Sequence, residues 1–136
     1  MNDKKRALFS FSVKDDQYFN DKQEKIELVS CQRDGNLCKG LLSDINNDLL
    51  ESGKYRRNKE FTQSIEILKN SFYKTFELQE SHCLKCAELF RSVITNSLEE
   101  IHKELKGMST GIFGSKRYQA SYILADDVLK DFKKES

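Results

Sequence analysis

The 136-residue chain contains no proline and no tryptophan, and it has only six glycines. Proline interrupts helices and marks turns and linkers, so its absence from a chain of this length favours a mostly helical protein. The glycines fall into groups that separate long uninterrupted segments, at positions 35–40, 53 and 107–114. These features predict long helices joined by short turns.

The sequence also lacks a long apolar run and an excess of charge of either sign. Charged residues make up 33% of the chain, and 23 Lys+Arg nearly cancel 22 Asp+Glu to a net charge of +1. This balance argues against a general polyanion binder, so we expect no nucleic-acid partner. No segment has the pattern of a membrane span or a secretory signal, so we expect a cytoplasmic protein with no membrane partner.

Three segments carry apolar side chains at the spacing of one helical face, with steps of three and four residues. We predict helices over 58–78, 82–106 and 115–133. Asn58 and Ser115 are the predicted N-caps of the first and third helix, and Gly107 is the predicted C-cap of the second. Helices of this length need partners of similar length, which favours near-antiparallel packing.

The first third of the chain has a weaker pattern. Leucines and isoleucines over 37–50 predict a helix that ends near Gly53, and residues 15–33 favour a helix over a strand. Residues 1–14 are expected to form a flexible or extended arm. The expected fold is therefore all-α, an antiparallel bundle of four to five helices that forms a single domain over 15–136.

The four cysteines lie in two groups along the sequence, Cys31 and Cys38 in a C-x6-C pair and Cys83 and Cys86 in a C-x2-C pair. His82 directly precedes the second pair. Cys83 and Cys86 fall on the apolar face of the predicted 82–106 helix, where a cysteine packs as a small apolar residue. This packing role needs no cofactor, and we favour it on the sequence.

Two other interpretations of the cysteines remain open. Thiolates three residues apart at a helix start provide half of a tetrahedral zinc site, which Cys31 and Cys38, or His82, would complete. A C-x-x-C at a helix N-terminus is also typical of thiol-redox proteins, although their usual β-α-β context is missing here. The predicted cofactor is therefore none, with zinc as the alternative.

A glycine-rich turn before the last predicted helix offers a candidate anion site. Gly114, Ser115, Lys116 and Arg117 place amides and two cations at a helix start, where phosphate commonly binds. The order of residues is not that of a P-loop, and we favour a simple turn between two antiparallel helices as its explanation.

No catalytic set is recognised, so we expect a non-enzymatic helical module that contacts another protein or a second copy of itself. The last predicted helix carries a heptad-like seam, the candidate interface, made of Tyr118, Tyr122, Ala125, Leu129 and Phe132. The alternative function is that of a zinc-binding or thiol-redox protein that uses Cys83 and Cys86.

Overall fold

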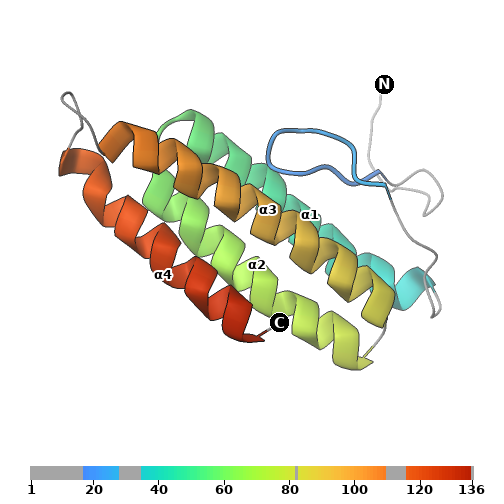
Figure 1. Cartoon of the computed structure of the whole chain (residues 1–136). Helices are drawn as coiled ribbons and strands as arrows, with labels where there is room; N and C mark the ends of the chain where they lie inside the picture. Colours follow the sequence, from blue (N-terminus) through green and yellow to red (C-terminus); the bar gives the residue numbers. More distant parts are fainter. Residues whose placement is uncertain (1–16, 28–34, 82, 110–115, 136) are drawn as a thin grey trace, which may run out of the picture.

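The computed structural model describes residues 17–27, 35–81, 83–109 and 116–135. The helices within these ranges are α1 (Gly35–Arg57), α2 (Phe61–Ser81), α3 (Leu84–Ser109), the short 3-10 turn η2 (Lys116–Tyr118) and α4 (Gln119–Glu135). Successive helices run in opposite directions and lie side by side (Figure 1). The predicted all-α antiparallel bundle is confirmed, with four α-helices in the described residues. None of these helices combines the length and the apolar character needed to cross a membrane.

The core lies where the apolar faces of the four helices meet. Its largest fully buried side chains are Phe61, Phe72, Phe90, Phe132, Ile45, Leu49, Ile65, Leu68, Leu78, Ile94, Leu98 and Ile101. Phe72 of α2 stacks on Phe132 of α4, with the ring planes 8° apart. Burying one such side chain stabilises the fold by about 1.5–3 kcal/mol, so the predicted apolar stripes are sufficient to hold the bundle.

Small polar residues let α1 and α2 approach closely. Ser52 and Ser64 are both buried, their Oγ atoms lie 2.7 Å apart, and Ser64 Oγ also donates to the Ser52 carbonyl at 2.9 Å. Because each hydroxyl finds its partner across the interface, the burial of these polar groups leaves no unpaired donor there.

Two predicted helix ends are wrong, because the glycines do not stop their helices. α1 continues through Gly53 to Arg57, and α3 continues through Gly107 to Ser109. At Gly53 the missing side chain makes room for another backbone: a Cβ built there would lie 2.1 Å from the Asp21 carbonyl oxygen. Glycine at this position therefore serves close packing and not helix termination.

The predicted start of α2 is also wrong by three residues. Asn58 is not the N-cap, since the first bond of the helix runs from the Ser64 N–H to the Glu60 carbonyl at 3.2 Å. Lys59 has a positive φ of 63° in the tight turn that precedes it. The second predicted N-cap, Ser115, lies outside the described residues.

Residues 17–27, which we call the strap, correct the prediction of a helix over 15–33. They form a tight loop closed by an antiparallel bridge between Phe19 and Lys25. The Asn20 side-chain oxygen accepts from the backbone N–H of Lys22 and of Glu24, both at 2.9 Å. This side-chain bonding offers the backbone an alternative to the helix, which explains the difference. Residues 1–16 and 28–34 lie outside the described residues, and the expected arm at 1–14 falls among them.

Candidate metal centre

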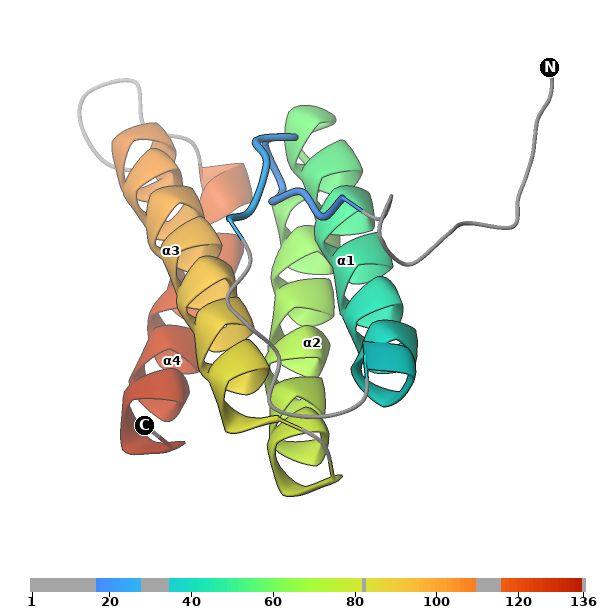
Figure 2. The same cartoon turned by 90° about the vertical axis from the view of Figure 1, so that its right-hand side faces the viewer.

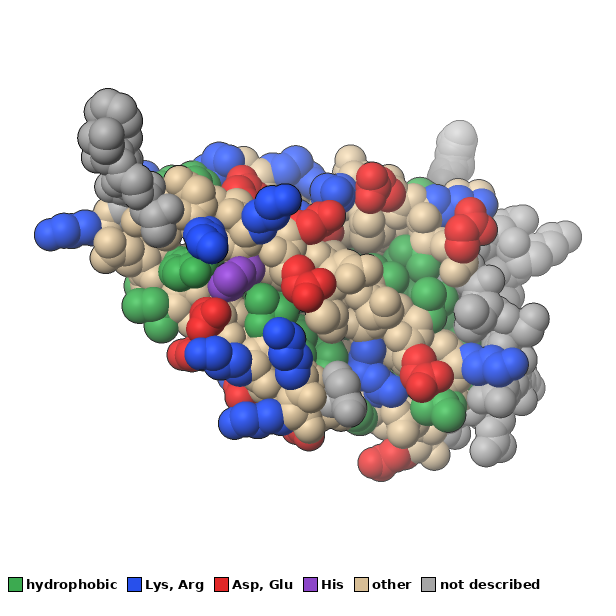
Figure 3. All heavy atoms as spheres, in the orientation of Figure 1, with side chains coloured by type: hydrophobic (Ala, Val, Ile, Leu, Met, Phe, Trp, Pro, Cys, Tyr) green, Lys and Arg blue, Asp and Glu red, His purple; other side chains and the backbone are tan. Residues whose placement is uncertain are grey.

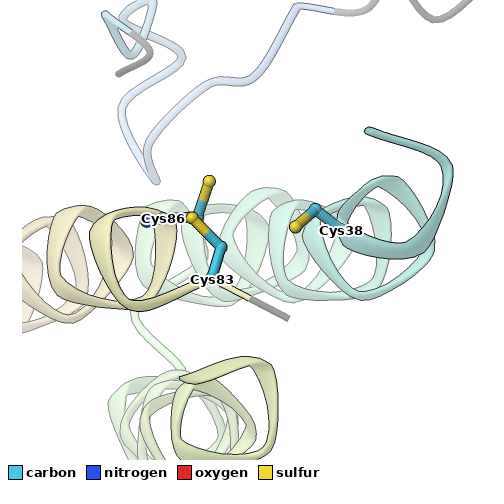
Figure 4. Close-up of side chains that lie close together, drawn as sticks. All are labelled: Cys38, Cys83 and Cys86. Carbon is cyan, nitrogen blue, oxygen red and sulfur yellow. Dashed lines mark hydrogen bonds between the residues drawn. The ribbon is translucent and has the colours of Figure 1, made fainter. Parts of the chain in front are cut away.

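Three cysteine side chains meet at the end of the bundle where α1 and α3 begin. Cys38 belongs to the first turn of α1, Cys83 directly precedes α3, and Cys86 lies in its first turn. Their Sγ atoms all lie within 4.8 Å of one another. Figure 4 shows the three side chains gathered at the starts of α1 and α3. All three residues are buried, with exposed fractions of 1%, 1% and 5%. The fold thus brings Cys38, from the first pair in the sequence, next to Cys83 and Cys86, which form the second pair.

The turn between α2 and α3 fixes the position of Cys83. Its N–H donates to the Leu78 carbonyl of α2 at 2.9 Å, and its own carbonyl accepts from the Ala87 N–H at 3.1 Å. Cys83 is therefore the N-cap of α3. Its sulfur accepts from the Cys86 N–H at 3.4 Å, in the place where a serine or aspartate oxygen usually caps a helix.

The backbone supplies a positive field at the three sulfurs. α1 and α3 point in the same direction, so their N-terminal ends lie side by side at the cysteines (Figures 1 and 2). Each helix N-terminus carries a partial positive charge, which stabilises a nearby thiolate relative to the thiol. The thiolate is the form that binds a metal.

The donor set fits a thiophilic ion. A tetrahedral zinc ion sits about 2.3 Å from each thiolate, which places the sulfurs about 3.8 Å apart. The observed separations of up to 4.8 Å therefore require only small side-chain adjustments. Three sulfur donors suit zinc, monovalent copper or cadmium better than magnesium or calcium, which prefer oxygen.

The other two predicted ligands, Cys31 and His82, lie outside the described residues. Cys38, Cys83 and Cys86 form no disulfide with one another. Their burial argues against the redox interpretation, because redox-active cysteines are usually accessible to solvent. Packing as small apolar residues and metal binding remain the two interpretations that the geometry favours.

Comparison with protein-family models, with curated proteins and with solved structures gave no significant match. The functional argument for this chain therefore depends on its own geometry.

The candidate anion site is described in part. Lys116 and Arg117 are exposed in η2, and the Arg117 guanidinium lies 5.4 Å from the centre of the Tyr118 ring. Gly114 and Ser115 lie outside the described residues, so anion binding here stays a prediction. On the face shown in Figure 3, cationic and acidic side chains are interspersed over α3 and α4.

The candidate interface seam of α4 packs largely within the chain. Ala125 and Phe132 are buried in the core, while Tyr118, Tyr122 and Leu129 are partly buried. The Tyr118 and Phe61 rings pack in a T-shaped arrangement, and the Tyr122 ring stacks on His102. The same stripe would suit an intramolecular or an intermolecular partner, and here the chain's own helices cover part of it. Self-association stays a prediction.

A second polar cluster, which the sequence analysis does not predict, joins the strap to the bundle. The side chain of Asp21 is fully buried, and its carboxylate oxygens accept from Arg56 Nη1 and Ser97 Oγ, both at 2.7 Å. Asp21 is one of three aspartates in the segment 15–33 that was predicted to be helical, and its partners lie 35 and 76 residues further along the chain.

Proposed function

We propose that this chain binds one thiophilic metal ion, with zinc as the first candidate, through Cys38, Cys83 and Cys86. The observation that supports the proposal is the convergence of three buried sulfurs from two separate helices within 4.8 Å. The ion would fasten the start of α1 to the start of α3. This is a structural role, because the thiols are shielded from solvent.

Packing alone accounts less well for the position of Cys83. N-cap positions favour serine, threonine, aspartate and asparagine, whose oxygens accept a strong hydrogen bond from the third helical N–H. Cys83 occupies this position with a sulfur that is a weaker acceptor. A thiolate held by a metal removes this disadvantage, because its negative charge strengthens the N–H···S bond.

The decisive experiment measures metal bound to the full chain, purified without chelator and without a metal-affinity tag. Native mass spectrometry and elemental analysis are expected to find one zinc ion per chain. The single variants Cys38→Ala, Cys83→Ala and Cys86→Ala should each lose it. Val128→Ala, which truncates a buried side chain on α4, is the control that should keep the ion.

Two outcomes would contradict the proposal. The wild-type chain could remain metal-free after incubation with zinc under reducing conditions, or the cysteine variants could bind as much zinc as Val128→Ala. Either result would assign the three cysteines to core packing. The same measurement on Cys31→Ser and His82→Ala tests the two residues that the sequence predicts as further ligands.

A further inference from the structure

The strap lies between α1 and α3 (Figure 2), and its contacts with Asn46 of α1 and with Phe90 and Ser97 of α3 define what we call the α1–α3 groove. Three of its residues, Tyr18, Asp21 and Ile26, are buried. The Tyr18 ring meets Phe90 of α3 edge to face, with the ring centres 6.0 Å apart. The strap thus inserts an aromatic, an acidic and an aliphatic side chain into one groove.

Asp21 of the strap is bound by Arg56 of α1 and Ser97 of α3. Besides Asp21, the Arg56 guanidinium binds Glu104 at 3.1 Å, which fixes its orientation. Burial opposes the positive charge of Arg56, but the hydrogen bonds and charges of Asp21 and Glu104 outweigh burial and raise its pKa above the ordinary value. Ser97 donates to the other carboxylate oxygen of Asp21. An acidic side chain is therefore recognised by charge and by two directed hydrogen bonds.

The groove also recognises the backbone of the strap. The Asn46 amide donates to the Phe19 carbonyl, and the Arg57 guanidinium donates to the Asp21 carbonyl at 3.3 Å. Gly53 lets that carbonyl lie directly against α1, where any side chain would clash. Hydrogen bonds to main-chain carbonyls, combined with sites for spaced side chains, are a common way for proteins to bind peptide segments.

The strap does not fill the groove completely. A cavity of about 430 Å³ opens between the strap turn and the ends of α1 and α3, and Gln23, Arg57, Lys59 and Glu104 are among the residues that line it. A longer peptide would find room in this cavity, beside the cationic side chains of Arg57 and Lys59 and the acidic side chain of Glu104. The strap has one β-bridge as its regular structure, so its position depends mainly on the contacts that its side chains and carbonyls make with α1 and α3.

We infer that the α1–α3 groove is a binding site for a peptide loop with the shape of the strap, which the strap occupies within its own chain. The pattern it accepts is an aromatic residue, an acidic residue three positions later and an aliphatic residue five positions after that, as in Tyr18, Asp21 and Ile26. A partner protein that presents this pattern displaces the strap. This inference is independent of the metal centre.

The test uses the full chain and a fluorescently labelled peptide of residues 17–27. In the wild type the tethered strap competes at an effective concentration on the order of millimolar, so binding of the peptide is expected to be weak. Asp21→Ala removes the anchor of the tethered strap and leaves its receptor intact. Fluorescence anisotropy should then show saturable binding at least tenfold tighter than in the wild type.

Three controls make the result specific. Glu27→Ala, an exposed charge of the strap, should bind the peptide as weakly as the wild type. A peptide carrying Ala in place of Asp21, and a chain carrying both Asp21→Ala and Arg56→Ala, should lose the gain. Asp21→Asn, which is closer in shape, replaces Asp21→Ala if circular dichroism shows that the latter is unfolded. Equal peptide binding by the wild type and both Asp21 variants, or binding unaffected by the Ala-substituted peptide, would overturn the inference.

Discussion

Gly53 shows how a single residue can have a role that its local pattern does not indicate. Glycine weakens a helix interior because it leaves the backbone unrestrained, and the sequence therefore predicted a helix end at this position. The structure instead has an unbroken helix whose missing side chain accommodates the Asp21 carbonyl. The determining contact comes from a residue 32 positions earlier, and the local sequence carries no record of it.

This contact predicts opposite effects for two glycines of the same helix. Gly53→Ala should destabilise the protein by about 1–3 kcal/mol, because the new methyl group clashes with backbone and the strap must move. Gly40→Ala has nothing within 4 Å of the new Cβ and should stabilise by about 0.5–1 kcal/mol through helix propensity. Urea unfolding of both variants measures the difference. Stabilisation by both substitutions would show that the strap does not press on Gly53.

Asp126 predicts a pH dependence at the exposed edge of α4. The hydrogen bond from Lys130, followed in effect by the Lys130 charge and His102, lowers the pKa of Asp126 below its ordinary value of 3.8, although burial opposes this. Because the folded-state pKa is depressed, the stabilising contribution is complete above the unfolded pKa and is lost as pH falls through the folded one.

The comparison of the wild type with Asp126→Asn by thermal unfolding should therefore show a small deficit for the variant near neutral pH. That deficit should shrink below about pH 4. Asp44→Asn, at an exposed position of α1, is the control. A deficit that stays constant down to pH 2 would indicate a role for Asp126 other than its charge.

At the scale of elements, periodic apolar spacing predicted the helices that bury one continuous face. Phe61, Ile65, Leu68 and Phe72 share a stripe, and all four are buried in α2. The strap was missed because its fold depends on Asn20, whose side chain competes with helix formation, and on a groove that exists only once α1 and α3 are packed. Local periodicity cannot report either condition.

Cys83 has two roles at the start of α3, as the N-cap of the helix and as a proposed metal ligand, and we expect that substitutions can separate them. Cys83→Ser keeps a cap for the Cys86 N–H, whereas Cys83→Ala removes it. In the presence of a chelator, Cys83→Ala should be less stable than Cys83→Ser by about 1 kcal/mol. Both should fail to bind zinc in the absence of chelator. Chemical unfolding of the two variants gives the first comparison, and equal stabilities would mean that the cap contributes nothing.

At the scale of the whole molecule, the alternation of helix directions creates the candidate metal centre. Cys38 and Cys86 lie 48 positions apart and come together because two odd-numbered helices of an antiparallel bundle begin at the same end. The C-x-x-C pair can be recognised in the sequence. That Cys38 lies beside this pair follows only from the arrangement of the helices in the bundle. For the same reason, the sequence could not show whether the α4 seam packs inside the chain or against a second one.

An ion that joins α1 to α3 should act on the stability of the entire bundle. A ligand bound only by the folded state adds about 2.7 kcal/mol when its free concentration is 100-fold above Kd. Zinc should therefore raise the Tm of the reduced wild-type chain by several degrees. It should leave the Tm of Cys38→Ala unchanged, although that variant keeps both cysteines of the C-x-x-C pair.

The pH dependence of this stabilisation follows from the chemistry of the ligands. Protons compete with the metal for thiolates, so the zinc-induced rise in Tm should diminish as the pH is lowered from 8 to 5. Magnesium, which prefers oxygen ligands, should give no shift at either pH. If Cys38→Ala responded to zinc as strongly as the wild type, the ion would be bound without α1 and could not link the two helices. Such a result would reduce the proposed centre to a local site on the α2–α3 turn.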